Sequence, residues 1–179
     1  MTKLPLLLPL LVASTAAAAP PKGAFKLATV QETGKKPIAL ADVYKQAGVV
    51  GEVIFELDDT KLTIGVLVMS KKAGKRPTVT SCRAGAAIPI KWKGETLELA
   101  APVDVIGWAD TTVMAEKGGG GTSDNSSTRC NFQVREVEYK VAVTGDKVTL
   151  THPKATMSFV RATGLSKVDV QTRAEEYVK

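Results

Sequence analysis

The chain has 179 residues, of which 44% are hydrophobic and 23% are charged, and its formal net charge is +6. This hydrophobic content excludes an intrinsically disordered chain, and the length excludes several large domains, since about 100 to 200 residues make one. The composition also excludes collagen and coiled coils. We therefore predict one folded domain that follows a leader.

The amino-terminal residues have the three parts of a secretory signal peptide. Lys3 supplies a positive charge, residues 4–13 form an apolar run, and residues 14–19 are small. The apolar run is much shorter than the roughly 20 residues of a membrane-spanning helix. We predict a signal peptide at residues 1–18, a single domain at 19–179, a secreted or periplasmic location and no transmembrane segment after cleavage.

One segment has helical periodicity. Its apolar residues recur at i, i+3, i+4 and i+7, at Leu40, Val43, Tyr44 and Ala47. Gly48 stands where a helix C-cap belongs, so we predict a short amphipathic helix over 39–47. A weaker pattern, a capping box formed by Thr172 and Glu175, predicts a second short helix in the tail.

Alternation of apolar and polar residues dominates the rest of the domain and indicates half-buried antiparallel strands. Residues 53–57 and 62–69 alternate on either side of a short connection at 58–61, which predicts a β-hairpin. Residues 88–92 and 97–101 predict a second hairpin.

Further strands follow along the chain. The segment 103–115 contains Gly107, where we expect a bulge or a bend. The alternation over 132–143 changes phase at Arg135-Glu136, which predicts a β-bulge there. The remaining predicted elements are a turn at 144–146, a strand at 147–151, and strands around Met157 and Phe159 and around Val168 and Val170.

These elements make an all-β protein, an antiparallel barrel or sandwich of about 8–10 strands with one or two short helices. Polar outer faces argue against a doubly wound parallel sheet, whose strands are apolar throughout. The outward positions carry charges that a lipid-facing strand would not tolerate. They are Glu52, Glu56, Lys91, Lys93, Glu95 and Glu98.

The two cysteines, Cys82 and Cys130, allow one intramolecular pairing, and an exported chain favours a disulfide between them. A metal site with His152 is disfavoured because the three residues lack ligand spacing. The Gly- and Ser-rich stretch 118–128 lacks the Lys-Ser or Lys-Thr pair of a phosphate-binding loop. We interpret it as a flexible loop between two strands.

A basic cluster formed by Lys71, Lys72, Lys75 and Arg76 lies between two predicted strands. It is either a solvated hairpin tip or a patch for an anionic partner such as a cell-surface polymer. No aromatic residue in that loop could stack on a base, so we expect no nucleic-acid partner. His152, the only histidine, lies at a strand end and is interpreted as structural or exposed, since no nucleophile motif accompanies it.

The leading hypothesis is an exported, non-enzymatic barrel protein that holds an apolar or amphipathic small molecule, because barrels of about eight strands can enclose one ligand. The expected pocket-lining aromatic residues are Trp92, Trp108, Phe132 and Tyr139. The alternative is a filled sandwich, an envelope, coat or adhesion component that acts through the basic loop and has no internal cavity larger than a water molecule. We expect no cofactor and no metal.

Overall fold

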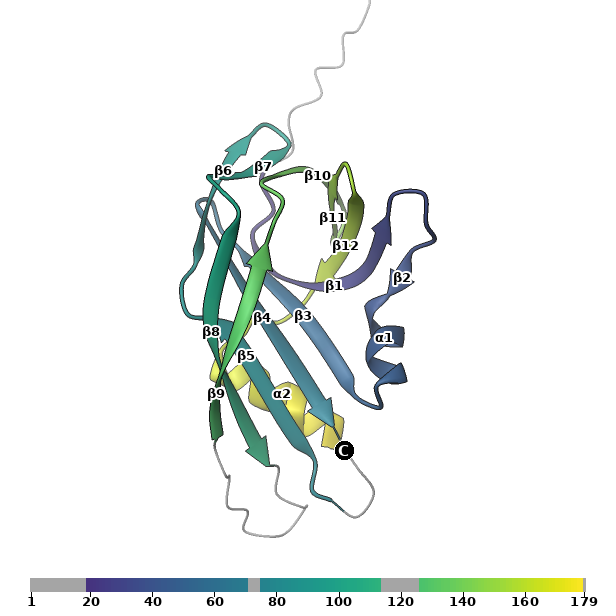
Figure 1. The fold of residues 1–179 in the computed structure, drawn as a ribbon, viewed down its shortest axis with the longest axis vertical. Coiled ribbons are helices and arrows are strands. Elements are labelled where there is room, and N and C mark those ends of the chain that lie inside the picture. Colours follow the sequence, from purple (N-terminus) through teal and green to yellow (C-terminus); the bar gives the residue numbers. More distant parts are fainter. Residues whose placement is uncertain (1–18, 71–74, 114–125, 179) are drawn as a thin grey trace, which may run out of the picture.

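The computed structural model describes residues 19–70, 75–113 and 126–178 (Figure 1). The predicted signal peptide at 1–18 and most of the predicted loop at 118–128 lie outside these residues, although 126–128 belong to a strand. The strands are β1 (Gly23–Glu32), β2 (Ile38–Ala39), β3 (Val50–Leu57), β4 (Lys61–Ser70), β5 (Thr78–Ala84), β6 (Ile88–Lys93), β7 (Thr96–Leu99), β8 (Val103–Val113), β9 (Ser126–Val134), β10 (Glu138–Thr144), β11 (Lys147–His152) and β12 (Ala155–Arg161). The helices are α1 (Leu40–Gln46) and α2 (Lys167–Val178).

Eight of the strands close into an antiparallel barrel. Their order is β1-β12-β11-β10-β7-β6-β4-β3, and β3 pairs again with β1. The hairpins β3–β4, β6–β7 and β10–β11 lie where the alternation predicts them. The all-β antiparallel prediction is therefore confirmed, and the structure decides for a barrel over a sandwich.

The long strand β4 belongs to two arrangements at once. Its first residues, Lys61 and Leu62, pair with β6 inside the barrel, whereas Gly65–Ser70 pair with β5. The sheet continues from β5 through β8 to β9, and we call these three strands the sheet extension. Figure 1 shows β6, β7, β10, β11 and β12 near one end of the molecule, while β3 and β4 run with the extension toward the other.

A β-bulge in β1 separates the part of the strand that pairs with β3 from the part that pairs with β2. The register between β1 and β12 shifts between Leu27 and Thr29, and such a shift sharpens the bend of a strand. Before the bulge β1 pairs with β3; after it, β1 stays paired with β12 and gains β2. Helix α1 contacts β1, β2 and β3, and the ring of its Tyr44 covers Gly51 so closely that a Cβ there would lie 2.3 Å away.

The main core lies inside the barrel. Inward-facing side chains from all eight barrel strands make one buried cluster, to which the extension adds partly buried residues from β8 and β9. The rings of Phe55 and Phe159 contact each other across it, with centroids 4.8 Å apart. The buried members are Phe25, Leu57, Leu62, Ile64, Ile88, Ile90, Leu97, Leu99, Tyr139, Val141, Val148, Leu150 and Phe159.

Helix α2 covers the opposite face of the sheet, behind β4 and β5 in Figure 1. Its Val170 packs against a second buried cluster of Leu67, Met69 and Val79. Leu165, just before the helix, occupies the space over Gly65, where a Cβ would lie 2.4 Å from the leucine side chain.

The strand predicted around Val168 and Val170 is therefore wrong, because a helix begins there. Ser166 and Asp169 form a reciprocal cap, in which the Ser166 hydroxyl donates to Asp169 Oδ2 at 2.6 Å and the Asp169 amide donates to Ser166 Oγ at 3.2 Å. Thr172, expected to begin the helix, lies inside it and donates to the Val168 carbonyl.

Two other expectations are also corrected. Gly107 is not a bulge: β8 pairs with β5 and β9 without a shift in register there. The phase change at Arg135-Glu136 marks a strand boundary, since β9 ends at Val134 and β10 starts at Glu138. The chain leaves the extension at that point and enters the barrel, so the two phases belong to different strands.

Glu56 joins the segment just before α2 to the barrel strand β3. We expect Glu56→Ala to lower the free energy of unfolding by about 1 to 2 kcal/mol. Its Oε1 accepts a hydrogen bond from the Leu165 amide at 2.7 Å, and its Oε2 lies 3.2 Å from Arg83 Nη2. Urea denaturation measures the loss. Glu56→Gln keeps an acceptor for the amide and should lose less; equal losses in the two variants would contradict this role for the amide contact.

Candidate ligand-binding cavity

A cavity of about 340 Å³ lies inside the barrel and opens to solvent on one side. Most of its wall is apolar because the inward positions of alternating strands carry aliphatic and aromatic side chains. These residues come from β3, β4, β7, β9, β11 and β12. They are Val53, Phe55, Leu57, Leu62, Ile64, Leu97, Phe132, Val134, Leu150 and Met157.

The polar part of the lining comes from the β9–β10 connection and the end of β11. Gln133 and Arg135 are exposed, while Glu136 and His152 are half-buried, so these residues mark the mouth of the cavity. The charges at the mouth are paired: Arg135 lies 3.4 Å from Asp104, and Lys154 Nζ lies 2.7 Å from Glu136 Oε1. The hydrogen bond from Lys154 lowers the pKa of Glu136, so this carboxylate stays ionised at neutral pH.

Two polar aromatic side chains meet where the apolar wall reaches the mouth. The rings of Tyr139 and His152 pack edge to face, with centroids 5.5 Å apart. Tyr139 is only 8% exposed, and its pKa is raised chiefly by burial and further by the charge of Glu136. His152 Nδ1 accepts a hydrogen bond from the Lys154 amide at 3.3 Å, which orients the imidazole.

The structure distributes the four aromatic residues named from the sequence over three places. Phe132 and Tyr139 line the cavity. Trp92 packs against the barrel core near the β6–β7 turn, and its buried indole N–H has no hydrogen-bond partner in the described part of the chain. Trp108 lies on the outer face of β8, is 54% exposed, and has the Arg129 guanidinium 5.6 Å from its ring centroid.

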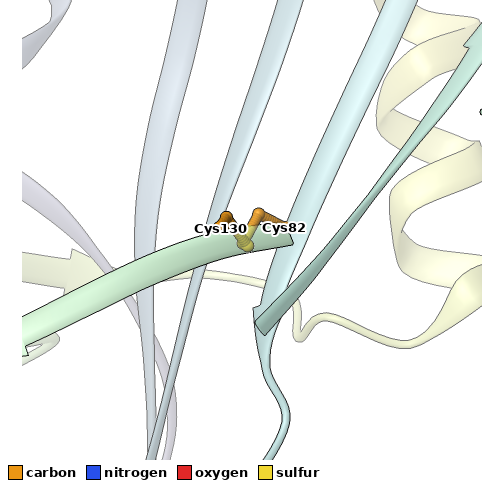
Figure 2. Close-up of a disulfide and its surroundings, with 2 residues drawn as sticks. All are labelled: Cys82 and Cys130. Carbon is orange, nitrogen blue, oxygen red and sulfur yellow. A yellow bond between two sulfur atoms is a disulfide. The ribbon is translucent and has the colours of Figure 1, made fainter. Parts of the chain in front are cut away.

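The disulfide between Cys82 and Cys130 is present, as the sequence predicts (Figure 2). It joins β5 to β9 across the strand between them, because Cys82 lies opposite Ala109 of β8 and Cys130 lies opposite Gly107. The two Cα atoms are 6.5 Å apart, whereas strands two places apart in a flat sheet are separated by about 9.6 Å. The extension is therefore strongly curled, and the disulfide holds β9, which carries Phe132, close to β5.

The basic cluster is described only in part. Lys75 and Arg76 are exposed between β4 and β5 and do not belong to the cavity lining, and Lys71 and Lys72 lie outside the described residues. Among the residues that the structure covers, no three His, Cys, Asp or Glu side chains gather as a metal site would require. Neither α1 nor α2 is long and apolar enough to cross a lipid bilayer.

Sequence reasoning left most of the cavity wall unnamed. The sequence interpretation gave His152 as structural or exposed; in the structure it lines the cavity, in the same phase of β11 as Val148 and Leu150. The sequence interpretation also concentrated on aromatic residues, whereas most of the wall is aliphatic. Residues 133–136, at the end of β9 and in the connection to β10, carried no local signal for the cavity mouth, because their position depends on how β9 and β10 pack in space.

Comparisons of the chain with protein-family models, with curated proteins and with solved structures find no match.

Proposed function

We propose that this protein is exported and holds an apolar or amphipathic small molecule in its barrel without transforming it. The observation that carries the proposal is the cavity itself. Its volume of about 340 Å³ falls within the range of small-molecule sites, roughly 300 to 1,000 Å³, and an apolar wall with a few polar groups is typical of such sites.

The cavity favours this proposal over the alternative, an envelope or adhesion protein that acts through the basic loop. That alternative required a filled interior with no cavity larger than a water molecule. Protein interiors are close-packed, and few of their voids exceed a water molecule. This cavity, at about 340 Å³, is far larger than a single water molecule, and it opens to solvent on one side. Binding of an apolar molecule would be favoured by about 25 cal/mol for each Å² of apolar surface that it removes from water.

Two further observations support export and a binding role. The Cys82–Cys130 disulfide is the kind of bond that persists in an oxidising compartment. Among the described residues, those that line the cavity include no serine, threonine or cysteine nucleophile, and at its mouth Arg135 is paired with Asp104 and Lys154 with Glu136. These features suit holding a ligand more than acyl transfer or hydrolysis.

Native mass spectrometry of the mature protein, exported into an oxidising compartment and never unfolded, tests the proposal directly. A mass increment that is present in the native spectrum and lost in the denaturing spectrum would support a bound molecule and give its mass. A bare chain in both spectra would overturn the proposal for the protein as it is produced.

We expect Val53→Phe to abolish or strongly reduce the bound increment, because a phenyl ring at this wall position occupies part of the cavity. The matched control is Val143→Phe, the same change at a strand position that is 42% exposed and outside the cavity lining. Circular dichroism checks that both variants fold. Equal ligand occupancy in the two folded variants would place the ligand elsewhere.

A further inference from the structure

We propose that the ligand is an apolar molecule with an uncharged carbonyl oxygen, and that the Tyr139 hydroxyl and the His152 Nε2–H donate hydrogen bonds to that oxygen. This inference rests on the proposed function and names the ligand class for the same cavity. It follows from three features at the mouth: a phenol with no hydrogen bond to the described residues, an imidazole whose Nδ1 already accepts a hydrogen bond, and Lys and Arg charges that are already paired.

Tyr139 provides the first donor. Its side chain is more than nine-tenths buried and lines the cavity, yet no residue in the described ranges makes a hydrogen bond with its hydroxyl. The hydroxyl is not among the described polar atoms that are enclosed without a partner, so an acceptor that enters the open cavity can reach it. Its raised pKa keeps the phenol protonated at neutral pH, and the group can therefore donate to an acceptor inside the cavity.

His152 provides the second donor. Because Nδ1 accepts the hydrogen bond of the Lys154 amide, Nε2 is the ring nitrogen that can donate into the cavity. The ring also lines the cavity and packs against Tyr139 at a centroid distance of 5.5 Å. The two rings thus lie side by side where the apolar wall ends, and a carbonyl oxygen has two lone pairs with which it can accept from both.

The charges at the mouth select an uncharged acceptor over a carboxylate. Arg135 is paired with Asp104, and Lys154 is paired with Glu136. Each of these cations therefore has an anion beside it, and the described mouth offers no unpaired positive charge. A carboxylate would lose its hydration on entering the cavity and would also approach Glu136, whereas a ketone or ester loses much less hydration.

Isothermal titration calorimetry with three ligands of similar length tests the inference. The ligands are methyl octyl ketone, decane and decanoate, which share an alkyl chain of a size that suits the cavity. For the wild-type protein we expect the ketone to bind more tightly than decane and decanoate. For Tyr139→Phe we expect the affinity for the ketone to fall about fivefold while that for decane stays the same, because one net hydrogen bond is lost.

Tyr44→Phe is the matched control, since it removes a phenol hydroxyl from α1, outside the cavity lining, and should leave all three affinities unchanged. Unchanged ratios of ketone to decane affinity in Tyr139→Phe would overturn the carbonyl inference and leave the apolar binding function standing. Tighter binding of decanoate than of the ketone would overturn the preference for an uncharged head. A wild-type protein that binds neither decane nor the ketone would overturn both proposals.

Discussion

Replacing Cys82 and Cys130 together with alanine is expected to lower the free energy of unfolding by about 4 kcal/mol. The disulfide closes a loop with a sequence separation of 48 residues, and loop-closure entropy predicts a stabilisation of this size. The bond also holds β9 at the edge of the sheet, where it pairs with β8 alone. Urea denaturation of the oxidised wild type and the double variant, fitted to a two-state transition, measures the difference.

The same double variant should also bind ligand more weakly. Phe132 lies on β9 two residues beyond Cys130 and forms part of the cavity wall, so a looser β9 widens that wall. The wild-type protein in reducing buffer serves as the control for the substitutions themselves. A stability loss below about 1 kcal/mol, or ligand occupancy equal to that of the oxidised protein, would show that the curl of the extension persists without the bond.

Gly107→Ala is expected to destabilise the protein by about 3 kcal/mol, a large effect for one methyl group. A Cβ at this position would lie 2.2 Å from the backbone oxygen of Arg83 and 3.1 Å from Cys130 Sγ. Neither neighbour can move away freely, since the first belongs to the adjacent strand β5 and the second to the disulfide. We expect slower disulfide formation as well, which thiol titration during refolding would measure.

Gly94→Ala is the control for Gly107→Ala. Gly94 has a positive φ of 59° in the β6–β7 turn, and a Cβ added there would have no heavy atom within 4 Å among its described neighbours. An alanine there should cost only the roughly 1 kcal/mol of a left-handed backbone conformation. If the two substitutions had the same effect on the unfolding midpoint, the close approach at Gly107 would not explain its cost.

Gly107 is a glycine within a strand, and the bulge that we predicted there from the sequence is absent. Glycine within a strand indicates either a bulge or a close approach of neighbouring atoms, and both meanings are consistent with its sequence context. Here β8 continues in regular register, and the missing side chain makes room for the disulfide that crosses it. Only the position of β5 and β9 on either side distinguishes the two meanings.

The candidate site was predictable to a similar, limited degree. The alternation places Phe132 and Tyr139 on inward faces, and both line the cavity. The same reasoning named Trp108, which faces outward from β8 next to Arg129. Alternation assigns residues to two faces of a strand but does not say which face meets the core, because that depends on the strands packed against it.

The sequence by itself determined the all-β class, the hairpins β3–β4, β6–β7 and β10–β11, the helix α1 and the single way to pair the two cysteines. These features depend on neighbouring residues or on a count, and short-range periodicity is enough to reveal them. Tertiary structure alone decided that β4 pairs with both β6 and β5, that β9 and β10 are separate strands, and that a cavity remains inside the barrel. Each of these depends on contacts between segments far apart in the chain, and a cavity is the space that such contacts leave unfilled, which no local pattern encodes.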